Sequence, residues 1–139
     1  MLPAADIKSF LDEKYKQYAS HSFIEHDPIQ IPHLYSKKED IEIAGFLAAS
    51  LAWGQRPMII RFVGTLLAKM GESPHEFIVN ASSDEFNSFA SFYYRTFNGI
   101  DCIAFLKSLQ RIYKQNGGLE EVFTKGYKKT KTVKATISC

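Results

Sequence analysis

The chain has only two cysteines among its 139 residues, and their positions exclude a disulfide framework. Cys102 falls within a predicted amphipathic helix and Cys139 is the last residue, so we expect two reduced thiols. Long apolar runs are also scarce, because Ser50 and the stretch 54–57 interrupt the longest one well before the roughly 18 residues that span a bilayer. The N-terminus has no basic start followed by an apolar segment. These features predict a soluble, cytoplasmic protein.

Histidine and glycine are too sparsely placed to form a familiar chemical site. His21 and His26 flank Glu25 beside a proline, where helical spacing of two metal ligands is not secured. The pair Gly117-Gly118 ends a helix instead of opening one, which does not fit a phosphate-binding loop. No Ser-His-acid or Cys-His arrangement is recognisable. We therefore expect no metal and no cofactor, and we assign no catalytic residue.

The chain is long enough for one domain, with 45% hydrophobic and 14% aromatic residues. We expect a helical domain over residues 1–127 and a basic segment over 128–139. Residues 1–121 carry 12 basic and 15 acidic side chains, net −3, whereas residues 122–139 carry five lysines and no acid, net +5. These lysines are Lys125, Lys128, Lys129, Lys131 and Lys134. They could follow phosphates of a nucleic acid or form a solvated linker.

Helical periodicity dominates the chain, and no useful stretch alternates with period two, so the fold class is predicted to be all-α. A first helix is expected from Ile7 to Tyr18, capped by Asp6, with its apolar residues on one face. An extended arm with two prolines should follow and lie over the core. About seven helices in an orthogonal arrangement are expected.

The central helix is predicted over about 39–53, opened by a capping box from Ser36 to Glu39. It is apolar or small on every side from Ile43 to Trp53, which predicts that protein surrounds it. Further capping signals begin at Ser73 and Ser82.

Later in the chain, Asn98-Gly99 breaks it before a long helix that ends at Gly117-Gly118, and a short turn should follow at Leu119–Phe123. The last residues predict the opening of another helix with no ending signal. We therefore expect a fragment of a longer protein, whose incomplete core would expose apolar surface and allow dimerisation.

The joint after the central helix is the main candidate site. In Trp53-Gly54-Gln55-Arg56, Gly54 can end a helix and the following Pro57 suits the first turn of the next. Gln55 and Arg56 are then displayed at a corner, with Arg61 one turn further on, where they could contact a partner.

Two other groups are ambiguous. Asp40 and Glu42 lie at the start of the central helix, where carboxylates either cap the helix or perform acid–base chemistry. Arg95 stands in an aromatic cluster, where it either contacts nucleic acid or pairs with Asp27, Asp40 or Glu42 at the edge of the core.

The string DPIQIPHLYSKKEDIEIAGFLAASLAWGQRPMII, followed by YYRTFNG, resembles the N-terminal half of an uncharacterised bacterial family of conserved hypothetical proteins common in Bacteroidetes. The residues that match this family's motif are Asp27, Pro28, Asp40, Glu42, Ala52, Gly54, Arg56 and Arg95.

This family is in turn distantly similar to the helix-hairpin-helix DNA glycosylases, in the order of an apolar helix, a glutamine-containing turn, an amphipathic helix and a Ser-Pro helix start. The resemblance implies that Gln55 fills the gap left by an extruded base and that Arg56 contacts a phosphate or base. The chain has no Leu-Pro-Gly-Val-Gly-type hairpin and no recognisable catalytic Lys or Asp.

Two functions from different classes follow. The first is a nucleic-acid-binding domain similar to a repair glycosylase, contacting DNA through Gln55, Arg56, Arg61 and the lysine segment. The second is a non-catalytic interaction or scaffold module in which Arg56 and Arg95 hold the fold together. Exposure of the first group on one face would favour the first function, and burial of the arginines against acids would favour the second.

Overall fold

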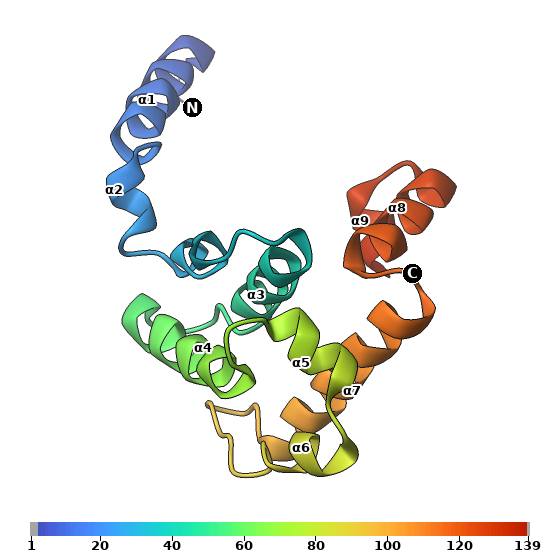
Figure 1. Cartoon of the computed structure of the whole chain (residues 1–139). Coiled ribbons are helices and arrows are strands. Elements are labelled where there is room, and N and C mark those ends of the chain that lie inside the picture. Colours follow the sequence, from blue (N-terminus) through green and yellow to red (C-terminus); the bar gives the residue numbers. More distant parts are fainter. Residues whose placement is uncertain (1–2, 139) are drawn as a thin grey trace.

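The structure, a computed structural model that describes residues 3–138, is built of α-helices and short 3₁₀ turns, with no strand in that range. This confirms the all-α prediction (Figure 1). The elements are α1 (Ala4–Tyr18), α2 (His21–Ile24), η1 (Pro28–Gln30), η2 (Pro32–Leu34), α3 (Lys38–Ser50), α4 (Arg56–Met70), α5 (Pro74–Asn80), α6 (Ser83–Asn87), α7 (Gly99–Gln115), α8 (Leu119–Thr130) and α9 (Val133–Ser138). The expected extended arm is instead α2 followed by two 3₁₀ turns, which raises the count above seven.

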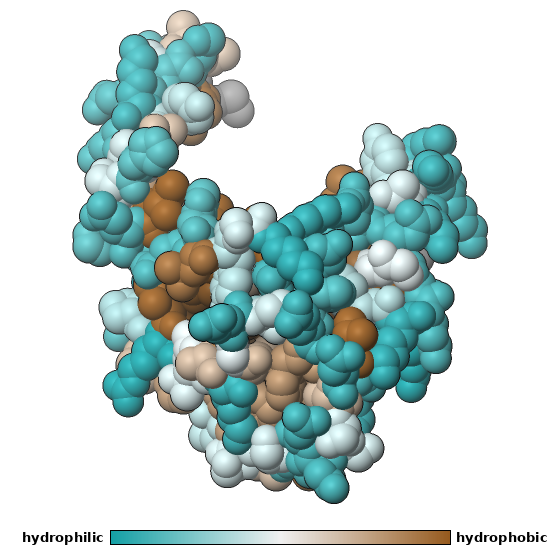
Figure 2. Space-filling view, viewed as in Figure 1, coloured by the Kyte–Doolittle hydropathy of each residue, from teal (hydrophilic) through white to brown (hydrophobic). Residues whose placement is uncertain are grey.

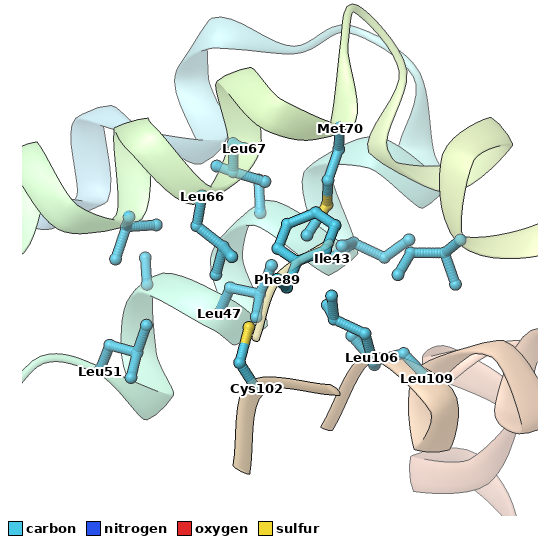
Figure 3. Packing of buried hydrophobic residues seen from close by; sticks show 14 of the residues in the cluster. Ile43, Leu47, Leu51, Leu66, Leu67, Met70, Phe89, Cys102, Leu106 and Leu109 are labelled. Atoms are coloured by element: carbon cyan, nitrogen blue, oxygen red, sulfur yellow. The ribbon is translucent and has the colours of Figure 1, made fainter. Parts of the chain in front are cut away.

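Helix α3 lies at the centre of the packing, in contact with η1, η2, α4, α5 and α8. Ile43, Ala44, Leu47 and Ala48 are buried, which places them on the face that meets α4 and α7. Figure 3 shows this core, to which the labelled residues Ile43, Leu47, Leu51, Leu66, Leu67, Met70, Phe89, Cys102, Leu106 and Leu109 contribute. Burial of these side chains is the main force that orders the helices.

The opposite face of α3 is only partly covered, by the turns η1 and η2 and by α8, so the prediction of a helix surrounded by protein holds only in part. Ile41 is 38% exposed, and Ala49 is exposed one turn before the joint. The cause is the arrangement of the chain, because α4, α5 and α7 all lie on one side of α3 in Figure 1. The part of α3 from Ile43 onward, which has no polar face, is therefore incompletely covered by residues 3–138.

The capping predictions have mixed outcomes. The Ser82 box is confirmed, with both reciprocal hydrogen bonds to Glu85 formed. At Ser73 only the serine half forms, as its hydroxyl accepts from the Glu76 N–H at 3.3 Å. The Ser36 box is wrong, because α3 begins at Lys38 after Lys37 with no side-chain cap.

The two ends of the chain also differ from expectation. Helix α1 begins at Ala4, so Asp6 lies inside its first turn and does not cap it. Its predicted apolar face exists, but no residue of α1 is buried, and in Figure 2 the helix stands clear of the body. Helix α8 runs to Thr130, well beyond the short turn expected at its start, and α9 occupies the segment where another helix was predicted to open. Residue 139 lies outside the described residues.

Candidate nucleic-acid interface at the joint between α3 and α4

The joint is the segment 51–55 with Arg56 at the start of α4. Helix α3 ends at Ser50, three residues before its predicted end, because Leu51 turns into the core and is 2% exposed. Gly54 has φ of +131°, and a Cβ placed there would lie 2.9 Å from both the Arg95 guanidinium and the Tyr94 hydroxyl. Gly54 is thus needed for its backbone conformation and for the close approach of a second segment.

That second segment is a tight turn in which Tyr94 and Phe97 exchange backbone hydrogen bonds of 2.8 and 2.9 Å. Arg95 stands at its tip with φ of +56°, a conformation that costs a residue with a side chain roughly 1 kcal/mol or more. Its guanidinium lies over the Trp53 ring, 5.3 Å from the ring centre, which gives a cation–π contact. The turn therefore fixes an arginine against an aromatic ring of the joint.

Arg95 does not form the ion pair proposed for it. Within residues 3–138, no carboxylate lies within 4 Å of its guanidinium, so it pairs with none of Asp27, Asp40 and Glu42. Both Arg95 and Trp53 are exposed, the latter to 37%. The charge of Arg95 is thus offered to solvent in a fixed orientation.

Arg56 is held differently. Its Nε lies 3.4 Å from an oxygen of Asp27, and its guanidinium carbon lies 5.4 Å from the centre of the Phe23 ring. Asp27 also accepts the N–H of Ile29 at 3.0 Å and so caps η1. The Arg56 side chain stays 59% exposed, because this contact occupies only one edge of the guanidinium. An exposed pair of this kind contributes little stability and leaves donors free.

Gln55 directly precedes Arg56 and occupies the N-cap position of α4, where it is exposed and makes no capping hydrogen bond. Arg61 is exposed further along α4, but it is five residues from Arg56 and so points about 140° away around the helix. The structure thus brings Gln55, Arg56, Trp53 and Arg95 to one corner and leaves Arg61 at its edge.

A pocket of about 500 Å³ opens beside this corner on the uncovered face of α3. Its floor is made of small residues of α3, its wall of the two 3₁₀ turns, and its rim of the Asp27–Arg56 pair. The lining residues are Asp27, Pro28, Ile29, Pro32, Gly45, Ala48, Ala49, Ala52, Gly54, Arg56 and Ile59. The volume lies in the range of small-molecule sites.

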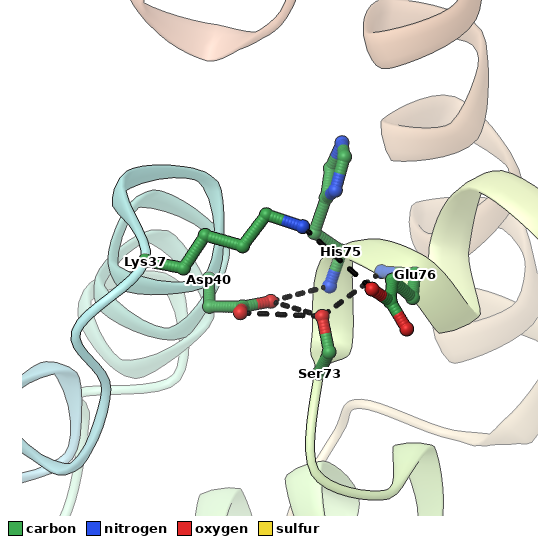
Figure 4. A network of polar contacts seen from close by, with 5 residues as sticks. All are labelled: Lys37, Asp40, Ser73, His75 and Glu76. Atoms are coloured by element: carbon green, nitrogen blue, oxygen red, sulfur yellow. Dashed lines mark hydrogen bonds and ion pairs between the residues drawn. The ribbon is translucent and has the colours of Figure 1, made fainter.

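Asp40 and Glu42 serve other contacts at the far end of α3. Asp40 is buried and accepts hydrogen bonds from the Ser73 hydroxyl at 2.9 Å and the His75 N–H at 2.8 Å, as Figure 4 shows. It therefore caps α5 and not its own helix. Glu42 accepts the Tyr113 hydroxyl at 2.8 Å, and burial together with this bond raises the pKa of Tyr113. Both acids thus join α3 to neighbouring helices, about 12–15 Å along the helix axis from its end at Ser50.

The predicted lysine segment lies elsewhere. Lys128 and Lys129 are in the last turn of α8, and Lys131 follows it with φ of +61°. Helix α8 packs on α3, α7 and α9, and Figure 1 shows it far from the start of α4. The structure therefore does not bring these lysines onto one surface with Gln55 and Arg56.

The remaining chemical candidates are weak. Cys102 is fully buried, and burial raises the pKa of its thiol to about 11, partly offset by Lys69, which disfavours the reactive thiolate. Within the described residues, no three His, Cys, Asp or Glu side chains are grouped to hold a metal ion. None of the helices in this range has both the length and the hydrophobicity of a bilayer-spanning segment.

Sequence reasoning missed two residues that build these sites. The Tyr94 hydroxyl donates to the Trp53 carbonyl at 3.0 Å and fixes the joint, and Ser73 presents its hydroxyl to Asp40. The aromatic cluster and the capping signal marked both positions, but neither signal names a partner 41 or 33 residues away.

The fold and the site together define a small all-α protein with an arginine- and tryptophan-bearing corner. A family model described as a protein of unknown function (DUF2400) matches residues 27–139, and the chain belongs to this family. The match begins at Asp27, so it includes the whole corner and excludes α1 and α2. Comparisons with curated proteins and with solved structures gave no match.

Proposed function

We propose that the protein binds nucleic acid through the joint, with Gln55, Arg56 and Arg95 as its contacts. The observation that carries the proposal is the Arg95–Trp53 contact at 5.3 Å, in which both side chains are exposed and the arginine has no carboxylate partner in residues 3–138. An arginine fixed over an aromatic ring offers a phosphate contact beside a surface on which a base can stack.

The electrostatics of the corner support this proposal. The corner carries two arginines, of which only Arg56 pairs with an acid, Asp27, and the N-terminus of α4 adds the partial positive charge of a helix dipole. A guanidinium whose edge is engaged by Asp27 still has donors for a phosphate oxygen. The corner is therefore a local site of positive charge on a body that is otherwise mildly acidic.

The resemblance to helix-hairpin-helix glycosylases supplies the preferred probe. In that class a glutamine can fill the gap left by a missing base, and Gln55 has an exposed amide with no capping bond to α4. We propose binding and not catalysis, because Asp27, the carboxylate nearest the corner, is already engaged with Arg56 and with the Ile29 N–H.

The test is binding of the chain to labelled duplex DNA, intact and with one abasic site, across a salt series. Two phosphate contacts predict a slope of log K against log salt of about −2, and Arg56→Ala or Arg95→Ala should reduce its magnitude by about 1. Gln55→Ala should weaken binding most at the abasic site. Arg111→Ala, an exposed arginine on α7, is the matched control and should change nothing.

Absence of salt-dependent binding at low ionic strength would exclude this function. Equal losses from Arg111→Ala and Arg95→Ala would show that binding is diffuse and that the joint is architectural.

A second candidate, a helical protein-interaction module, is favoured by a different observation. Helix α1 is amphipathic, yet none of its residues is buried. Its five large apolar side chains are 43–73% exposed. An isolated helix of 15 residues is marginal in water, so an α1 of this composition needs a surface to pack on. Hydrogen exchange of the α1 amides tests this candidate: rapid exchange in the dilute chain is expected, with protection only on association.

A further inference from the structure

Two apolar surfaces of the chain have no partner in residues 3–138. The first is the face of α1 formed by Ile7, Phe10, Leu11, Tyr15 and Tyr18. Spacings of three and four residues place these side chains along one stripe about 16 Å long. Beyond an edge contact between the Tyr18 and Phe23 rings at 6.4 Å, the helix makes no substantial contact with another element.

The second surface is a groove between the open face of α3 and α8, which we call the α3–α8 groove. It comprises a cavity of about 530 Å³ lined by Pro32, Ile41, Glu42, Gly45, Phe46, Leu119, Glu120 and Phe123. A smaller cavity of about 260 Å³ continues it past Phe123, lined also by Thr124, Tyr127, Val133 and Thr136. Phe123 lines both cavities, so the two adjoin at this side chain.

We propose that two copies of this chain exchange their α1 helices, each laid in the α3–α8 groove of the other. The proposal rests on the interaction-module candidate and is independent of nucleic-acid binding. It assigns the same two surfaces to both copies, which gives a closed, two-fold symmetric pair.

The position of the segment that follows α1, which we call its root, favours exchange of α1 between two copies over folding of α1 back onto its own chain. The segment that follows α1 is anchored beside the joint, where Arg56 contacts Phe23 and Asp27. The groove shares Pro32 and Gly45 with the pocket beside the joint and runs from them past Ile41 to Phe123 of α8, on the side away from the contacts of Arg56. Figure 2 shows a wide gap between α1 and the α8–α9 pair of the same chain. A second copy can fill that gap with no change at the anchored root.

The area that α1, the arm, can bury favours exchange of two arms between two copies over binding of a single arm in one groove. Complete burial of a Phe or Tyr side chain removes about 150–250 Å² of its surface from water. The five apolar side chains of α1 are 43–73% exposed, so together they still present about 500 Å² of surface to solvent. One arm against an equal area of groove would bury about 1,000 Å² in total, less than most stable interfaces. Two exchanged arms would bury about 2,000 Å², within the usual range.

The family match is consistent with an added arm. It begins at residue 27, so it includes the groove but not α1. The groove, the core and the Asp27–Arg56 half of the anchor thus belong to the family segment, whereas Phe23 and the arm precede it.

The experiment is sedimentation equilibrium of the 139-residue chain with charged substitutions on each surface. We expect a dimer whose dissociation constant rises at least about tenfold in Phe10→Glu with Leu11→Glu, and likewise in Phe123→Glu. The matched control, Ala5→Glu with Ser9→Glu, adds the same charge to the opposite face of α1 and should leave the dimer intact. Because α1 has no buried residue, these α1 variants should retain the helical content of the core.

Single-cysteine pairs identify the arrangement in a Cys139→Ser background. Leu11→Cys mixed with Phe123→Cys should give a disulfide between two chains, which supports exchange. A monomer, or a dimer insensitive to the α1 variants, would overturn it. A monomer with rapidly exchanging α1 amides would overturn exchange while leaving the interaction module with another partner. A third outcome is a monomer with protected α1 amides, in which the double variant Leu11→Cys with Phe123→Cys forms a disulfide within one chain. This outcome would overturn both the exchange of helices and the interaction module.

Discussion

The Tyr94 hydroxyl donates a hydrogen bond of 3.0 Å to the carbonyl oxygen of Trp53, and this bond ties the arginine-bearing turn to the joint. The two rings also pack at 5.5 Å between centres. Since the joint carries the proposed contacts, the order of this corner depends on a tyrosine that makes no proposed contact itself.

Tyr94→Phe should lower the free energy of unfolding by about 1 kcal/mol, because it removes one partly buried hydrogen bond and keeps the ring. Urea denaturation followed by far-ultraviolet circular dichroism measures the change. Tyr93→Phe is the matched control, since Tyr93 is exposed, and its effect should be close to zero. Equal effects of the two substitutions would contradict the role given to the bond.

Gly54→Ala should destabilise the chain by about 1–3 kcal/mol. The backbone at φ of +131° disfavours alanine, and its Cβ would lie 2.9 Å from Arg95 and Tyr94. Gly64→Ala should have the opposite sign and stabilise by up to about 1 kcal/mol, because Gly64 is in α4 with no atom within 4 Å of its Cβ position. Thermal unfolding of both variants checks the pair, and a stabilising Gly54→Ala would refute the geometry of the joint.

Asp40→Asn should cost about 1–3 kcal/mol, because the buried carboxylate accepts from both Ser73 and the His75 N–H and an amide satisfies this pair poorly. Hydrogen exchange should show the loss at the start of α5. Glu72→Gln, an exposed acid just before Ser73, serves as the control for the loss of one negative charge. If only Asp40→Asn exposes α5, then Asp40 caps that helix.

The thiol of Cys102 should make stability depend on pH in the alkaline range. Its pKa rises from 9.0 to about 11 in the folded chain because of burial. The unfolded chain then loses the thiol proton first, so stability is full below pH 9 and falls as pH rises toward 11, by up to about 2.7 kcal/mol. The difference between Cys102 and Cys102→Ala chains, measured by urea denaturation in a Cys139→Ser background, isolates this effect. A constant difference from pH 8 to about pH 11 would contradict it.

Local signals in the sequence predicted local structure well. The Ser82–Glu85 capping box and the start of the long helix α7 after Asn98 both form as expected, because each depends on residues within one turn. The Ser36 signal failed, because α3 begins at Lys38 and Lys37 holds the N-cap position. The contact of Asp40 with Ser73, 33 residues away, depends on tertiary packing and has no local signal.

The candidate site shows the same division. The sequence predicted a corner at Gly54 with Gln55 and Arg56 displayed, since glycine, proline and apolar periodicity specify where helices end and begin. It did not predict that Arg95 would lie over Trp53, because that contact depends on the turn between Tyr94 and Phe97 and on its packing against a segment about 40 residues earlier. The pairing of an arginine with an acid or an aromatic ring is decided by which side chain the folded chain brings near.

Composition and periodicity alone determine that this chain is all-α, because the spacing of apolar residues and the capping residues act over a few positions. The tertiary structure decides which faces of those helices are covered. Helix α3 is apolar or small on every side from Ile43 onward and α1 is apolar along one stripe, yet α3 is buried only in part and no residue of α1 is buried. Burial depends on the placement of distant helices in space, and the local sequence of a helix carries no information about how many neighbours will reach it.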